Sequence, residues 1–242
     1  MRLSEKQLHE LLEALDPGAA ARVALTYRDS NSGPPEHLGI LDASFNPLTL
    51  AHTRMLELAA ESFHFDERLL LLAKSNVDKP IFGATLVHRL QMMELMAREA
   101  ADTSVGATAH GRFIDKAKAL KNLFGNDCRL SFILGFDTVI RLFDSKYYDD
   151  MPSALEELFN LAEVIYTNRT GHVERERSEL LDSPDVVPFV THLHFIELEM
   201  PYCEMSSTEA RKRVKNNSAA EEVVPASVLA FSREKCLYMN DE

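Results

Sequence analysis

Apolar residues recur along this chain at two different spacings, and the two alternate. Leucines at helical spacing over residues 8–15 predict an amphipathic helix that ends at Asp16-Pro17-Gly18. Short apolar runs bounded by turn residues predict buried strands at residues 38–42, 68–73, 103–108, 129–134, 163–167 and 193–198. Further helical patterns cover about 49–62, 85–100, 112–124 and 154–161, and helices are also expected after Gly135-Phe136-Asp137, from Ser206 and from Pro225.

Alternation of strands and helices predicts an α/β fold, a Rossmann-like doubly wound parallel sheet with helices on both faces. We expect one domain of 242 residues. Residues 1–36 would form an N-terminal helical extension and loop, residues 38–215 the core, and residues 216–242 a C-terminal helix. The charged, proline-containing residues 172–188 are expected to form a surface excursion. Ligands of such sheets bind beyond the carboxyl ends of the strands.

Composition narrows the class of protein. The apolar share of 45% and the charged share of 26% are typical of soluble globular proteins. A formal net charge of -12 argues against binding along a nucleic-acid backbone, which requires a broad basic surface. Three scattered cysteines without a C-x-x-C pair favour neither a zinc site nor a disulfide framework. Because no apolar run is long enough to span a membrane, we expect a cytoplasmic or nuclear protein that does not bind membranes. The sequence leaves open whether the chain forms a homo-oligomer.

Two segments have the character of phosphate sites. Residues 38–52 run from an apolar strand through a small-residue turn into a helix that carries His52 in its first turn. Such a turn directs free backbone N–H groups and the positive end of the helix dipole at one point. Far downstream, residues 206–208 place three hydroxyls at a helix start, followed by Arg211. Ser206 and Glu209 alone also fit a capping box that needs no ligand.

These segments resemble motifs of the HxGH-type nucleotidyltransferases, and among them the nicotinamide mononucleotide adenylyltransferases. Residues 43–52 (A-S-F-N-P-L-T-L-A-H) resemble the G-S-F-N-P-x-T-x-x-H segment of that family, and residues 205–211 (M-S-S-T-E-A-R) resemble its I-S-S-T-x-x-R segment. Residues 76–95 are similar to its substrate-lysine region and H-R-x-x-M helix, and the G-x-D and N-R turns correspond to residues 135–138 and 167–171.

The resemblance implies transfer of the adenylyl group of ATP to a pyridine mononucleotide, with Mg²⁺ on the triphosphate and no metal site made by the protein. It assigns catalysis to His52, Thr49 and Arg211. The ATP-binding residues that it implies are Ala43, Ser44, Phe45, His52, Asp137, Asn168, Arg169, Ser206, Ser207, Thr208 and Arg211. Lys79 would meet the phosphate of the mononucleotide, although a lone lysine before a proline is usually a solvated loop residue.

The chain departs from the family pattern in two places. Ala43 replaces the glycine of the strand-ending turn, and no tryptophan is present to stack on the pyridine ring. Phe143, Tyr147 or Tyr148 are the aromatic residues expected to replace it. Two alternatives therefore stay open: a nucleotidyltransferase for another phosphate acceptor or for cytidylyl transfer, and a nucleotide-binding regulatory protein with a degenerate acceptor site.

Overall fold

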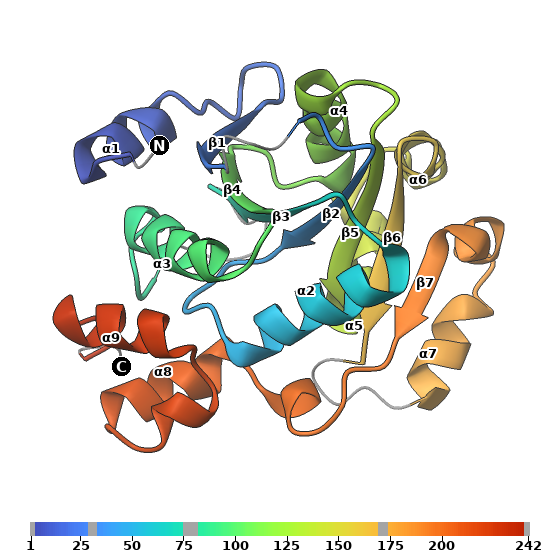
Figure 1. Cartoon of the computed structure of the whole chain (residues 1–242). Helices are drawn as coiled ribbons and strands as arrows, with labels where there is room; N and C mark the ends of the chain where they lie inside the picture. Colours follow the sequence, from blue (N-terminus) through green and yellow to red (C-terminus); the bar gives the residue numbers. More distant parts are fainter. Residues whose placement is uncertain (1–2, 29–32, 75–81, 169–173, 240–242) are drawn as a thin grey trace.

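The computed structural model describes residues 3–28, 33–74, 82–168 and 174–239, which build one sheet covered by helices on both faces (Figure 1). The seven strands of this sheet are β1 (Val23–Tyr27), β2 (His37–Asp42), β3 (Glu67–Ala73), β4 (Thr103–Thr108), β5 (Arg129–Gly135), β6 (Ala162–Thr167) and β7 (Leu193–Ile196). Their order across the sheet is β1-β4-β3-β2-β5-β6-β7. Every neighbouring pair is parallel except β1 with β4.

Helices cover the two faces in separate groups. The α-helices are α1 (Glu5–Glu13), α2 (Leu50–Phe63), α3 (Leu86–Glu99), α4 (Phe113–Phe124), α5 (Phe136–Leu142), α6 (Met151–Phe159), α7 (Glu174–Leu181), α8 (Ser207–Lys215) and α9 (Ala226–Glu234). Short 3₁₀ helices are η1 (Ser145–Tyr147), η2 (Val187–His192), η3 (Tyr202–Glu204) and η4 (Ala220–Glu222). Helices α1, α2, α3, α8 and α9 pack on one face, and α4, α5 and α6 on the other. Within the described ranges, no helix is long and apolar enough to cross a membrane.

The predicted α/β fold is confirmed. Strand β3 shows why the strands could be predicted from the sequence. Leu70 and Leu72 pack with the α2 and α3 side chains, whereas Leu69 and Leu71 face the core under α4. All four are fully buried because helices cover both faces of the sheet. Central parallel strands of this kind appear in a sequence as continuous apolar runs bounded by turns.

The structure differs from the sequence-based expectations in three elements. The segment before residue 36 contains, besides its helix, the edge strand β1, whose Thr26 hydroxyl donates to the Val105 carbonyl at 3.3 Å. Residues 174–181 of the expected surface excursion form the helix α7, and α6 begins at Met151 rather than near residue 154. Strand β1 was missed because its five residues show no clear alternation and its pairing partner lies about 80 residues away in sequence.

Gly39 in the middle of β2 leaves room for an aromatic ring. A Cβ atom at this position would lie 2.4 Å from the ring of Phe65, far inside van der Waals contact. We expect Gly39→Ala to lower the free energy of unfolding by about 1–3 kcal/mol through overpacking. Urea denaturation measures this loss, with Gly33→Ala as the matched control, because a Cβ atom there meets nothing within 4 Å. Equal stabilities of the two variants would contradict the role assigned to Phe65.

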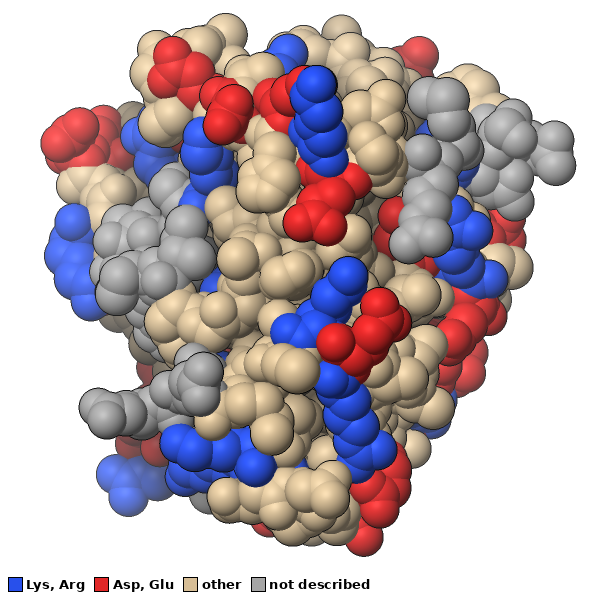
Figure 2. Space-filling view, turned by 90° about the vertical axis from the view of Figure 1, so that its left-hand side faces the viewer, with Lys and Arg blue, Asp and Glu red and all other residues tan. Residues whose placement is uncertain are grey.

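One face of the molecule carries mixed charge. Figure 2 shows the face that α1, α3 and α9 cover, where basic and acidic side chains are interspersed. The described residues on this face form no broad basic area. That the chain does not bind nucleic acid stays a prediction from its net charge.

The order in which the chain adds strands to the sheet reverses between the neighbouring strands β2 and β5. Helix α2 leads from β2 to β3 on one side, whereas the chain after β5 leads through α5 and α6 to β6 on the other. Connections that diverge in this way leave a crevice at the carboxyl ends of the two adjacent strands. Both β2 and β5 end there in turns that open helices, so two helix N-termini face the same crevice.

Candidate active site

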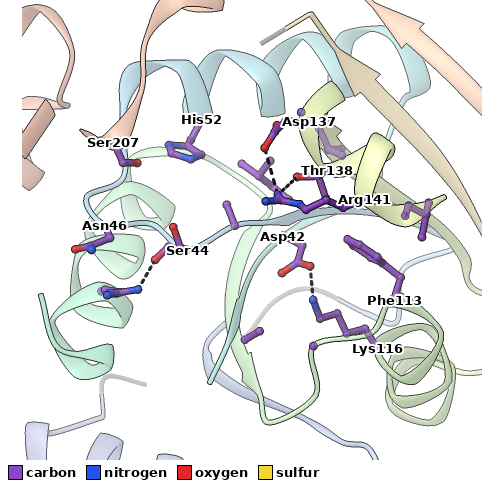
Figure 3. Close-up of a pocket in the computed structure, with 18 of the residues that line it drawn as sticks. Asp42, Ser44, Asn46, His52, Phe113, Lys116, Asp137, Thr138, Arg141 and Ser207 are labelled. Carbon is purple, nitrogen blue, oxygen red and sulfur yellow. Dashed lines mark hydrogen bonds and ion pairs between the residues drawn. The ribbon is translucent and has the colours of Figure 1, made fainter. Parts of the chain in front are cut away.

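A cavity of about 590 Å³ opens at this crevice. Its wall comes from the ends of β2, β3 and β5 and from the first turns of α3, α4, α5 and α8. Ala43 lines the cavity. The polar and aromatic lining residues are Asp42, Ser44, Asn46, His52, Lys74, Phe82, Arg89, Arg112, Phe113, Lys116, Asp137, Thr138, Arg141, Tyr147, Tyr148, Ser206, Ser207, Thr208 and Arg211. Figure 3 shows His52 and Ser207 at one end of the cavity and Phe113 and Lys116 at the other.

His52 is fixed in one tautomer by the turn that precedes it. The backbone N–H of Thr49 donates to Nδ1 of His52 at 3.0 Å, and the Thr49 hydroxyl lies 2.7 Å from the same nitrogen. Because Nδ1 accepts the backbone bond, the neutral ring carries its proton on Nε2. The ring is 2% exposed yet lines the cavity, so the imidazole is held rigidly against the space for a ligand.

Two residues predicted to meet ATP lie beneath the cavity. Thr49 is fully buried and is absent from the cavity lining, because its side chain turns to the imidazole of His52. Its predicted direct contact with phosphate is therefore corrected to a role in positioning His52. Phe45 is also fully buried, with its ring centroid 5.2 Å from that of His52. The contact expected of Phe45 is through its backbone N–H, and it stays a prediction.

The start of α8 forms the opposite wall of the phosphate end. Ser206 caps the helix by accepting from the Glu209 N–H at 3.1 Å, and the Ser207 hydroxyl donates to the Pro47 carbonyl at 3.0 Å. Arg211 donates to the Asn46 carbonyl at 2.7 Å and to the Thr208 hydroxyl at 3.2 Å. The two motifs, more than 150 residues apart, are thus joined by direct hydrogen bonds around one cavity.

Arg89 adds a second guanidinium at the same end. It is 4% exposed and donates to the backbone carbonyls of Ala84 at 2.9 Å, Phe82 at 2.6 Å and Ser44 at 3.2 Å. Burial lowers the pKa of Arg89, and the nearby charge of Arg211 lowers it further. Among the described residues, neither arginine forms an ion pair with a carboxylate, so this end of the cavity has positive charge available for an anion.

Asp42 and Lys116 form a buried ion pair at the other end of the cavity, and the sequence motifs did not single them out. Their side chains are 8% and 4% exposed, and Oδ2 of Asp42 accepts from Nζ of Lys116. The ammonium also lies 4.8 Å from the centroid of the Phe113 ring. The available sequence signal was a carboxylate at the end of a buried strand, a position that faces the ligand crevice.

The aromatic residues expected at the pyridine ring divide into two groups. Tyr147 and Tyr148 line the cavity, and the Tyr148 hydroxyl donates to the Leu142 carbonyl at 2.7 Å. Burial raises the pKa of Tyr148 to about 12, so this tyrosine stays neutral at physiological pH. The prediction for Phe143 is corrected, because its ring packs against Phe159 and Phe189 in the core and does not line the cavity.

Phe113 is the aromatic residue that the sequence analysis missed. It begins α4, lines the cavity and contacts the ring of Phe132 edge-on at 5.2 Å between centroids. An apolar residue at a helix start looks like an ordinary core position in sequence. Only the sheet order brings the beginning of α4 to the carboxyl end of β2.

The remaining predicted residues are placed as follows. Asp137 lines the cavity and pairs with Arg141 at 3.2 Å. Asn168 lies in a separate cavity of about 270 Å³, where its Oδ1 accepts from the Leu198 N–H at 2.7 Å. Its assignment to the adenine end stays a prediction. Lys79 and Arg169 lie outside the described residues, and their assigned roles also stay predictions.

Comparison with known proteins identifies the family to which this cavity belongs. Residues 40–213 match the family described as Cytidylyltransferase-like, a span that includes both phosphate-end motifs. The chain belongs to the cytidylyltransferase-like family. A putative nicotinamide mononucleotide adenylyltransferase of Schizosaccharomyces pombe is 34% identical over 135 residues, which cover 54% of this chain and 52% of that protein. The chain thus spans about half the length of this relative.

Other similar proteins match over most of their length. A probable nicotinate-nucleotide adenylyltransferase of Pelodictyon phaeoclathratiforme is 26% identical, over 85% of this chain and 93% of that protein. The solved structure of Plasmodium falciparum nicotinic acid mononucleotide adenylyltransferase with NaAD has a TM-score of 0.64 at 19% identity, and covers 85% of this chain and 98% of that one. The structural likeness confirms the fold, and the family match confirms the resemblance drawn from the motifs.

Proposed function

We propose that this chain transfers the adenylyl group of ATP to the phosphate of nicotinamide mononucleotide or nicotinic acid mononucleotide. The products are NAD or deamido-NAD, together with pyrophosphate. The observation that carries the proposal is that His52 and the start of α8 lie around one cavity. The phosphate end of this cavity has two arginines, neither of which has a carboxylate partner among the described residues. The relatives named above for adenylyl transfer to pyridine mononucleotides support this choice of substrates.

The reaction needs no protein nucleophile. A phosphate oxygen of the mononucleotide attacks the α-phosphorus of ATP, and the bond from that phosphorus to the bridging oxygen of the β-phosphate breaks. Negative charge grows on the bridging and leaving oxygens, so the enzyme must hold two anions in line and stabilise this charge. Donors that are fixed before the substrates bind serve this purpose best.

The residues of the cavity fit that task in the following roles. The Nε2–H of His52 donates to the α-phosphate region, with Thr49 fixing the tautomer. Ser206, Ser207, Thr208 and Arg211 hold the phosphates that leave as pyrophosphate. The backbone at Ser44 approaches the reacting phosphorus, and Asp137 meets the ribose of ATP.

Magnesium enters this scheme as part of the MgATP substrate. Mg²⁺ prefers phosphate oxygens and water over a cage of protein side chains. Over the described ranges, no group of three or more acidic, histidine or cysteine side chains is placed to hold a metal. The cations of the protein then act beside the magnesium on the same triphosphate.

Ala43 is the feature that favours a second candidate function. It lines the cavity where the family pattern has glycine, and its methyl group lies where the backbone must approach phosphate. A protein that binds ATP there without productive binding of the mononucleotide would be a regulatory nucleotide-binding protein. This candidate differs from the enzyme in one measurable respect, the formation of dinucleotide.

The test is a coupled assay of the purified chain with ATP, Mg²⁺ and nicotinamide mononucleotide, in which alcohol dehydrogenase reduces the NAD formed to NADH. Nicotinic acid mononucleotide and CTP, with products separated by chromatography, serve as the alternative acceptor and donor. We expect mononucleotide-dependent dinucleotide formation with ATP and little with CTP. Binding of ATP without conversion of either mononucleotide would contradict the proposal and favour the regulatory candidate.

A further inference from the structure

We propose that the buried pair of Asp42 and Lys116 contacts the substituent on the pyridine ring and makes this chain select a carboxamide over a carboxylate. The inference rests on the proposed function, because it assumes that a pyridine mononucleotide occupies the cavity. Lys116 lies outside both phosphate motifs, and Asp42 directly precedes the motif of residues 43–52.

The pair lies where a planar ring would stack. Asp42 ends β2, Lys116 lies in α4, and Phe113 precedes Lys116 by one helical turn (Figure 3). Tyr147 and Tyr148 line the same cavity and supply further aromatic faces. A flat cationic pyridinium ring is favoured against such faces, and this end lies away from His52 and Ser207 (Figure 3).

The charges of the two ends of the cavity differ in how they are compensated. At the aromatic end, Lys116 pairs with Asp42, Arg112 pairs with Asp115 at 2.9 Å, and Arg141 pairs with Asp137 at 3.2 Å. At the phosphate end, Arg89 and Arg211 donate to backbone carbonyls and hydroxyls. Phosphates therefore find net positive charge at their end, whereas a carboxylate on the pyridine ring would meet cations that are already neutralised.

Hydrogen-bond capacity favours the amide as well. Oδ2 of Asp42 accepts from Lys116, and no described residue donates to Oδ1. A carboxamide N–H can donate to Oδ1 of Asp42 while the amide oxygen accepts from the Lys116 ammonium. A carboxylate has no donor, so it would place its lone pairs against those of Asp42.

Lys74 is the cavity cation that could bind a carboxylate instead. Its ammonium donates to the carbonyls of Leu12 at 2.9 Å and Leu15 at 3.0 Å, at the end of α1. Helix α1 packs on the opposite face of the sheet from α4, so Lys74 extends away from the side on which Lys116 and Phe113 lie. Selection by Lys74 would favour nicotinic acid mononucleotide, which is the reverse of the present inference.

The test compares kcat/KM for the two mononucleotides, and their Kd by calorimetry, in wild type and three variants. We expect wild type to prefer the amide by roughly tenfold or more. Asp42→Asn leaves Lys116 uncompensated and should shift this ratio toward the acid by about tenfold, whereas Lys116→Met leaves Asp42 uncompensated and should shift it toward the amide. Lys118→Met on the same helix removes an exposed pair with Glu157 and is the matched control with an unchanged ratio.

Opposite shifts in the two single variants are the decisive readout, because a merely structural role would impair both substrates alike. Each single variant buries an unpaired charge, so the double variant Asp42→Asn/Lys116→Met covers the case in which they do not fold. We expect the double variant to lose most of the discrimination. Wild-type preference for the acid, equal effects on both substrates, or discrimination retained in the double variant would each overturn the inference. Wild-type binding selectivity without any turnover would instead remove the proposed function and leave the inference standing.

Discussion

Replacing His52 by alanine is expected to lower kcat by about two to three orders of magnitude while the fold is kept. The imidazole is fixed by the Thr49 backbone, so the ring lines the cavity in one orientation before substrate arrives. A donor that needs no reorganisation contributes mainly to the transition state, where charge on the phosphates is greatest. The loss should therefore appear in kcat much more than in the KM for ATP. Steady-state kinetics of dinucleotide formation measure both constants.

Two further variants separate catalysis from packing at this position. His52→Gln keeps an N–H donor on a side chain of similar reach, and we expect it to recover part of the lost kcat. His9→Ala on the exposed surface of α1 is the control for loss of a histidine and should leave kcat unchanged. Near-normal kcat in His52→Ala, with a native circular dichroism spectrum, would rule out the transition-state role.

Replacing Arg211 by alanine is expected to have the second largest effect. The guanidinium faces the triphosphate end and has no carboxylate partner among the described residues, so its charge is available to the phosphates that leave as pyrophosphate. Loss of this charge should raise the KM for ATP and also lower kcat, together reducing kcat/KM by about two to three orders of magnitude. Initial rates over a range of ATP concentrations at saturating mononucleotide measure the effect.

The matched control for Arg211 lies two residues away on the same helix. Arg213 pairs with Glu209 at 3.0 Å and Glu222 at 2.8 Å and does not line the cavity. Arg213→Ala should cost some stability and leave the KM for ATP unchanged. Arg211→Lys keeps the charge but loses the forked donor geometry, so we expect an intermediate KM. If Arg211→Ala and Arg213→Ala changed the KM for ATP equally, the assignment of Arg211 to the triphosphate would be wrong.

The sequence predicted the central parallel strands well because their burial is local information. The leucines of β3 give both faces of this strand apolar side chains, and turns bound the strand on either side. Strand β1 depends instead on pairing with β4, whose residues lie far away in sequence, and its own five residues carry little signal. Helix α7 has no buried residue, so its charged sequence lacked the apolar stripe by which a helix is recognised.

The two ends of the cavity differed in how far they could be predicted. His52, Ser206 and Arg211 lie in contiguous motifs whose residue types and spacing indicate an anion site. Phe113 and Lys116 lie on α4, and only the strand order carries them to the end of β2. Phe143 shows the reverse error, because its sequence position beside the G-x-D turn gives no sign that its ring points into the core.

The most direct test of adenylyl transfer follows the label of α-³²P-ATP in the presence and absence of nicotinamide mononucleotide. We expect the label to appear in the dinucleotide only when the mononucleotide is present, with one unlabelled pyrophosphate released for each dinucleotide. Labelled ADP or AMP that forms at the same rate without the mononucleotide, and no labelled dinucleotide with either mononucleotide, would contradict it.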